Sequence, residues 1–188
     1  SEATDIQVVA ESGSYTEVRE VLRTHPCDVL VLDLNLPGRG GLEVLSSLRE
    51  AGSPIRVLIV SMFAEDQYAI RCLRAGADGY LNKAGNPADL IPAVRTVANG
   101  RKHVSPEVAE MLVGNLSAPE GGALHASLSE RELQTLIKIA SGKQLSAIAE
   151  ELMLSLRTVS VYRARVLEKL HLSNNAELTV YAIRNSLV

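Results

Sequence analysis

Short apolar runs alternate with longer amphipathic segments over the first hundred residues. The apolar runs predict strands at residues 6–10, 29–32, 56–60 and 80–81. Apolar residues at helical spacing predict helices that begin after Ser14 and that span residues 42–48, 65–74 and 87–98. Strands and helices in strict alternation predict an open parallel α/β sheet, because parallel neighbours need a crossover helix between them.

The strand pattern ends near residue 99. A short helix is predicted at residues 106–116, and a connector rich in Ser, Pro and Gly follows at residues 117–122. Beyond the connector the apolar spacing predicts four amphipathic helices, the first opened by a capping box of Ser129 and Glu132. We therefore expect an α/β domain at residues 1–103, a linker with a short helix at 104–127 and an all-α domain at 128–188.

Composition narrows the class of protein. The chain has 188 residues, of which 46% are hydrophobic and 22% charged, which excludes disorder and fits one domain or two small ones. The net charge of −3 gives no overall basic field, so any DNA binding requires a local patch. No apolar run has the length of a membrane span, and Cys27 and Cys72 form no pairing motif. These features predict a cytoplasmic protein with reduced thiols and no membrane contact.

Three polar residues follow three of the predicted strands. They are Asp33, Ser61 and Lys83. Ligands of open parallel sheets bind beyond the carboxyl ends of the strands, where these side chains are expected to meet. Together they would supply a nucleophilic carboxylate, a hydroxyl and a cation, which is chemistry suited to a phosphoryl group.

The segment around Asp33, with Pro37 four residues and Gly41 eight residues later, resembles the phosphoacceptor loop of receiver domains in two-component response regulators. The resemblance implies a flavodoxin-like fold in which a sensor histidine kinase phosphorylates Asp33. It also implies that Ser61 and Lys83 bind the phosphoryl group.

Two further positions take roles from the same resemblance. Tyr80 corresponds to the aromatic residue that turns inward on activation. The backbone carbonyl of Asn35 corresponds to a Mg²⁺ ligand, so the metal site would consist of Asp33, Asn35 and an acidic pair.

The acidic pair is where this chain departs from the receiver pattern. In receivers the pair follows a first strand, and no residue before Ile6 matches either feature, so the first strand and first helix are expected to be missing from this chain. The missing strand would lie between residues 6–10 and 29–32. Three explanations stay open: a preceding segment outside this sequence, a strand supplied by another chain, or a truncation that abandons phosphorylation.

The helical tail contains a basic helix after a tight turn. The turn at Leu154 and Ser155 leads to a helix beginning near Arg157, and two helices joined in this way are typical of a helix-turn-helix. Residues 156–171 contain four Arg or Lys residues and a single acidic residue, Glu168, so positive charge is concentrated there.

This block, including Thr158-Val159 and Lys169-Leu170, resembles the LuxR-type helix-turn-helix of NarL/FixJ-class response regulators. The resemblance implies a homodimer on promoter DNA, with dimer contacts from the helix that starts at Asn174 and Asn175. Family members often carry Lys at Ser160 and a basic residue near Ala164, so base contacts here would be lighter or shifted to arginines. The resemblance implies groove-facing residues Ser160, Val161 and Ala164, and phosphate contacts from Arg157, Thr158, Arg163, Arg165 and Lys169.

Three functional hypotheses follow. The first is a transcriptional response regulator switched by phosphorylation of Asp33, and the second is a phosphorylation-independent dimeric regulator with a degenerate receiver. The third is a phosphohydrolase with Asp33 as nucleophile. It is disfavoured because such enzymes need a second Asp, as general acid, where Asn35 stands. We therefore expect that the protein is not an enzyme.

Overall fold

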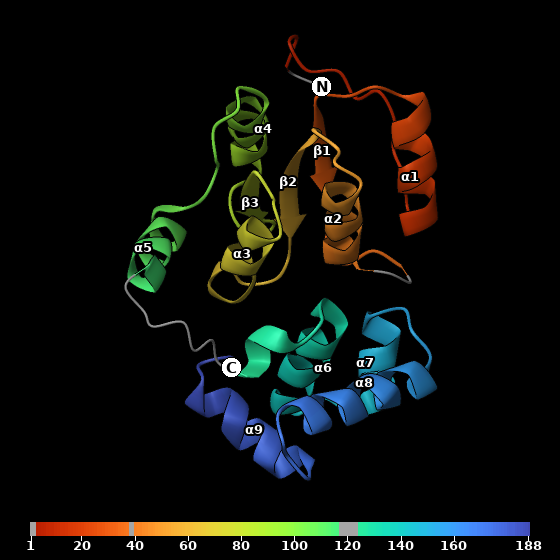
Figure 1. Cartoon of the computed structure of the whole chain (residues 1–188), viewed down its shortest axis with the longest axis vertical. Helices are drawn as coiled ribbons and strands as arrows, with labels where there is room; N and C mark the ends of the chain where they lie inside the picture. The colour runs from red at the N-terminus through yellow and green to blue at the C-terminus, as the bar shows by residue number, and fades with distance from the viewer. Residues whose placement is uncertain (1–2, 38–39, 117–123) are drawn as a thin grey trace. The chain divides into compact units, whose positions relative to one another are not determined.

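The computed structural model describes residues 3–37, 40–116 and 124–188 (Figure 1). The chain divides into two compact units, Ser1–Ser117 and Ala118–Val188, and each is described by itself. The predicted connector at residues 117–122 lies outside the described residues, as do residues 38–39 in the loop after Asp33.

The first unit contains a three-stranded parallel sheet in the order β1-β2-β3. The strands are β1 (Val29–Leu32), β2 (Arg56–Ser61) and β3 (Gly79–Asn82). The helices are α1 (Tyr15–Thr24), α2 (Gly41–Glu50), α3 (Glu65–Arg74), α4 (Leu90–Ala98, after a 3₁₀ turn at Pro87–Asp89) and α5 (Pro106–Leu116). These elements confirm the predicted parallel α/β sheet and the positions of its helices.

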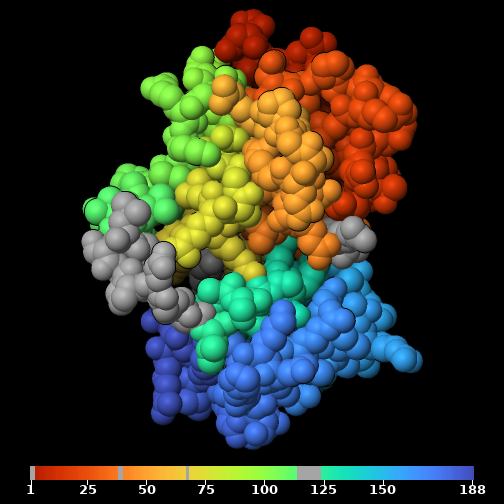
Figure 2. Space-filling view, viewed as in Figure 1, coloured from red at the N-terminus to blue at the C-terminus, as the bar shows by residue number. Residues whose placement is uncertain are grey.

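The central strand β2 contributes fully buried side chains to the core on both faces of the sheet. Leu58 is fully buried and packs against Ala93 and Val97 of α4. Val57 and Ile59, also fully buried, alternate to the opposite face. On one side of the unit α2 and α3 lie next to each other and cover the sheet, in orange and yellow in Figure 2.

The prediction of a strand at residues 6–10 is wrong. These residues have no regular structure, and Val8 and Val9 are exposed. A strand needs a neighbour that accepts and donates backbone hydrogen bonds, and apolar alternation alone does not supply one. Among the described residues β1 pairs with β2 and with no second strand, and Val31 on β1 is 47% exposed. This open edge lies where the sequence predicted a gap in the sheet.

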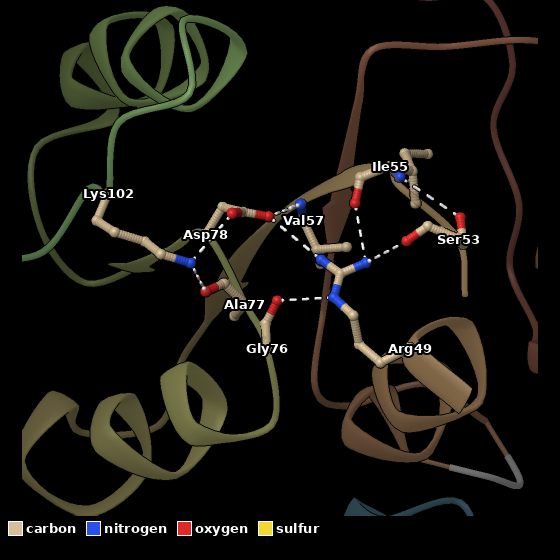
Figure 3. A network of polar contacts seen from close by, with 8 residues as sticks. All are labelled: Arg49, Ser53, Ile55, Val57, Gly76, Ala77, Asp78 and Lys102. Atoms are coloured by element: carbon tan, nitrogen blue, oxygen red, sulfur yellow. Dashed lines mark hydrogen bonds and ion pairs between the residues drawn. The ribbon is translucent and has the colours of Figure 1, made fainter. Parts of the chain in front are cut away.

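A polar network closes the end of the sheet opposite Asp33 (Figure 3). The guanidinium of Arg49, on α2, donates to the carbonyls of Ser53, Ile55 and Gly76 and to the carboxylate of Asp78. The same carboxylate accepts from the Val57 N–H at 2.9 Å and pairs with Lys102. Charged groups therefore hold three connecting segments against the first residues of the strands.

The second unit is helical throughout its described part. A 3₁₀ turn (Leu124–Ser127) precedes α6 (Glu130–Ala140), α7 (Leu145–Glu151), α8 (Leu156–Lys169) and α9 (Asn175–Arg184). The predicted capping box is confirmed, since Ser129 and Glu132 each accept from the other's backbone N–H. Helix α6 packs against α8 and α9, and the core is formed by Leu136, Ile148, Val159, Val166 and Leu178.

No helix in the described part of the chain combines the length and apolarity needed to cross a membrane.

Candidate functional site

The structure brings Asp33 and Lys83 together at one edge of the sheet. Asp33 follows β1 and Lys83 follows β3, so the two side chains meet across the end of β2. Lys83 Nζ lies 2.6 Å from Asp33 Oδ2, and the backbone N–H of Asn35 donates to Asp33 Oδ1 at 2.9 Å. The carboxylate is thus held by a cation on one oxygen and by a backbone donor on the other, while about a third of the side chain stays exposed.

Ser61 and Tyr80 lie on the same part of the sheet. Ser61 ends β2 and is fully buried, its Oγ accepts from the Phe63 N–H, and its carbonyl accepts from the Lys83 N–H. The Tyr80 hydroxyl donates to the Phe63 carbonyl at 2.8 Å. Burial raises the pKa of Tyr80, so the phenol stays protonated and keeps donating. The inward Tyr80 therefore fixes the loop that follows Ser61.

Gly41 allows α2 to begin directly against Asp33. The Gly41 N–H donates to the Leu34 carbonyl at 3.0 Å, and a Cβ at Gly41 would lie 2.2 Å from the Asp33 carbonyl oxygen. No side chain fits at that distance. The resemblance to receivers singled out this glycine by its position, and the close backbone approach gives the physical reason.

A contact that sequence reasoning missed joins α3 to α5. The Ser105 hydroxyl donates to Glu65 Oε2, and Ser105 Oγ also accepts from the Val108 N–H at the start of α5. The pair Ser105-Pro106 is a local sign of a helix start. The partner Glu65 stands 40 positions away, where no local pattern points to it.

The described residues do not by themselves form a metal site. No group of three or more His, Cys, Asp or Glu side chains in residues 3–37, 40–116 and 124–188 is placed to hold a metal ion. Asp33 contributes one carboxylate, and both of its oxygens already have partners. Mg²⁺ prefers an octahedron of oxygen ligands, commonly with one or two carboxylates. The expected set of Asp33 and the Asn35 carbonyl is therefore incomplete here.

Helix α8 exposes one face of the predicted helix-turn-helix. Ser155 caps the helix by accepting from the Thr158 N–H, and its Oγ lies 2.7 Å from Thr158 Oγ1. The buried Val159 and Val166 turn the opposite side of the helix toward solvent. The predicted DNA-contacting residues that are exposed are Arg157, Ser160, Val161, Ala164, Arg165 and Lys169.

Two of the basic residues on α8 are engaged by neighbouring helices. Lys169 Nζ lies 2.6 Å from the buried Glu132 Oε2, and Arg163 Nε donates to Asn175 Oδ1 at 2.6 Å. Burial acts to raise the pKa of Glu132, but the hydrogen bonds from Lys169 and the Ser129 N–H outweigh it and hold that pKa below its usual value. Arg157 and Arg165 have no such hydrogen bond or ion pair among the described residues.

Two family models match the chain. The response regulator receiver domain matches residues 2–95, and the family of bacterial regulatory proteins called luxR matches residues 126–182.

Curated relatives match along nearly the whole chain. The response regulator UvrY of Escherichia coli K12 is 33% identical, and the response regulator GacA of Pseudomonas protegens is 36% identical. Each comparison covers 97% of this chain, together with 84% of UvrY and 86% of GacA.

Two solved structures are also similar. RcsB from Salmonella enterica serovar Typhimurium, bound to promoter rprA in the presence of phosphomimetic BeF3-, is 25% identical with a TM-score of 0.56 over 93% of this chain and 84% of RcsB. A LuxR-family two-component response regulator from Aurantimonas sp. SI85-9A1 is 33% identical with a TM-score of 0.53. That comparison covers 59% of this chain and 79% of the other.

Proposed function

The chain belongs to the response regulators that join a receiver domain to a LuxR-type helix-turn-helix domain, and on this basis we propose that it is a transcription regulator controlled at Asp33. In this proposal a sensor histidine kinase phosphorylates Asp33, and the helical tail binds promoter DNA as a homodimer in the cytoplasm. The proposal assigns the chain no enzymatic turnover and no membrane contact.

The contact between Asp33 and Lys83 is the observation that carries the phosphorylation part. When a carboxylate oxygen of Asp33 attacks the phosphorus of a phosphohistidine donor, an O–P bond forms, the N–P bond breaks and the imidazole leaves. The acyl phosphate would lie beside the Lys83 ammonium, which is already 2.6 Å from Asp33 Oδ2. A cation in that position balances the added negative charge. Ser61 ends the strand between them and would be the hydroxyl ligand of the phosphoryl group.

The described residues hold only part of a magnesium site. Receiver domains typically use Mg²⁺ for phosphorylation, but the described residues offer it one carboxylate whose oxygens are both engaged. A second candidate function is a phosphorylation-independent dimeric regulator whose receiver is degenerate, and the engagement of both Asp33 oxygens by Lys83 and the Asn35 N–H favours it.

The surface of the helical unit supports the DNA-binding part. Helix α8 presents the exposed arginines Arg157 and Arg165, which suit the DNA backbone. Lys169 and Arg163 keep donors beyond those used by Glu132 and Asn175, so they remain proposed phosphate contacts of a weaker kind. On α9 the exposed Val180 and Ile183 offer an apolar face for the dimer.

One experiment separates the two candidate functions. The chain is incubated with acetyl phosphate and Mg²⁺, its intact mass is recorded, and its affinity for DNA selected from a random pool is measured. Asp33→Asn is the test variant, and Asp66→Asn, on the exposed side of α3, is the matched control.

Phosphorylation control predicts that one phosphoryl group is added to the wild type and to Asp66→Asn but not to Asp33→Asn, and that its addition tightens DNA binding. If no phosphoryl group is added and Asp33→Asn binds DNA as the wild type does, the receiver is degenerate. If no DNA is selected at all, the DNA-binding part of the proposal fails.

A further inference from the structure

The outward face of α8 has an apolar centre. Successive helical residues are 100° apart, so Arg157, Val161 and Ala164 project within about 60° of one another. All three are exposed, and Val161 is 43% exposed. The buried Val159 and Val166 on the other side fix this orientation, so the short apolar side chains stand where a groove-facing helix meets base edges.

Polar groups near this centre are already occupied. The Ser160 hydroxyl donates to the Leu156 carbonyl at 2.9 Å, which leaves it able to accept but not to donate. Thr158 Oγ1 is bonded to Ser155 Oγ, and the basic groups of Arg163 and Lys169 are turned toward Asn175 and Glu132. Arg157 and Arg165 have no such partner among the described residues. Along the chain, one precedes and the other follows the apolar centre formed by Val161 and Ala164.

An apolar centre of this kind matches one feature of the major groove. Thymine presents a C5-methyl group there beside its O4 acceptor, whereas the other bases present only hydrogen-bond donors and acceptors at their edges. Alanine and other short apolar side chains contact that methyl group favourably. Placed against a hydrogen-bond donor or acceptor of a base, the same side chains would leave that polar group desolvated and unpaired.

We propose that Val161 and Ala164 recognise thymine methyl groups in each half-site, so that the central base contacts of this protein are apolar. This inference rests on the proposed DNA binding and adds the chemistry by which the helix chooses its sequence. Arg157 and Arg165 then position the helix on the flanking phosphates.

The test replaces thymines by deoxyuridine, which removes the methyl group and keeps every hydrogen-bonding group. DNA is first selected from a random pool by the full chain, and each thymine of the selected site is then replaced singly. We expect about fourfold weaker binding at one or two thymines per half-site, the effect of one methyl group withdrawn from an apolar contact. Val161→Ala should abolish the sensitivity at one of those thymines.

Val113→Ala, an equally conservative change at an exposed valine of α5, is the matched control and should keep the wild-type sensitivity. The inference is overturned if DNA is selected but every thymine tolerates deoxyuridine. It is also overturned if Val161→Ala keeps the full sensitivity. If no DNA is selected, the proposed function fails and this inference fails with it.

Discussion

The Ser105 hydroxyl donates a 2.5 Å hydrogen bond to Glu65 Oε2 and so ties the start of α5 to the start of α3. Helix α3 begins four residues after Ser61, and α5 is the last helix before the second unit. The two helices also pack against each other, and each has a buried side chain, Tyr68 on α3 and Val108 on α5. The bond therefore joins the start of α3, close to the proposed phosphoacceptor site, to the last helix of the first unit.

We expect Ser105→Ala to destabilise the first unit by about 1 kcal/mol, because it removes both the helix cap and the bond to Glu65. Glu65→Gln keeps an acceptor and should cost less. Urea unfolding of the three proteins measures the difference. Equal losses in the two variants would mean that the charge of Glu65, rather than the cap of α5, carries the stabilisation.

Gly41→Ala should cost about 3 kcal/mol, because the new Cβ would stand 2.2 Å from the Asp33 carbonyl and force the loop away from α2. The same displacement should reduce phosphoryl uptake at Asp33. Gly13→Ala is the control, since its Cβ would meet an ordinary contact at 3.8 Å, and should change little. Similar unfolding free energies for the two variants would contradict the close approach.

The ion pair between the buried Glu132 and the exposed Lys169 gives the helical unit a pH dependence. The folded pKa of Glu132 lies below its unfolded value near 4.5, so its contribution to stability is present above that pH. The contribution is lost as pH falls from about 4.5 through the lower folded pKa. Hydrogen exchange of the α6 and α8 amides should therefore speed up at acid pH.

Glu132→Gln should flatten this dependence, because its amide does not titrate. Glu150→Gln, an exposed position on α7, should leave the dependence unchanged. A Glu132→Gln protein that keeps the wild-type slope between pH 3 and 5 would show that another group carries it.

Local sequence patterns predicted most of the elements because helix caps and apolar periodicity act over a few residues. The capping box at Ser129 and the bounds of α5 are of this kind, and the meeting of Asp33 with Lys83 follows from parallel strands ending at one edge. The strand prediction for residues 6–10 was wrong because an apolar run becomes a strand only beside a partner strand.

Local sequence patterns could not predict the polar contacts between residues that are far apart in the chain. The bond between Ser105 and Glu65 depends on how α3 and α5 pack, and no spacing rule relates residues that far apart. The contacts of Lys169 and Arg163 were missed for the same reason, and they change the picture of the basic helix. The count of charges assumed that all four cations of α8 are available to DNA, whereas Lys169 and Arg163 contact neighbouring helices.

Arg49 offers the sharpest test of the network in Figure 3. Its guanidinium donates to three carbonyls and to Asp78, and Arg49 and Asp78 are each about three-quarters buried or more. A lysine at this position presents one compact ammonium group and cannot satisfy these acceptors together. We expect Arg49→Lys to cost about 2 kcal/mol in urea unfolding, because several partly buried carbonyls lose their donor.

Lys102→Met removes the more exposed cation from Asp78 and should cost less than 1 kcal/mol, since Asp78 keeps its bonds to Arg49 and to the Val57 N–H. Burial acts to raise the pKa of Asp78, and the Val57 N–H, Lys102 and Arg49 together hold it below its usual value. The hydrogen bond and charge of Lys102 lower this pKa more than the charge of Arg49 does, so losing Lys102 should raise the pKa of Asp78 more than losing Arg49. An NMR titration of Asp78 in which the Arg49 variant gives the larger shift would contradict this order.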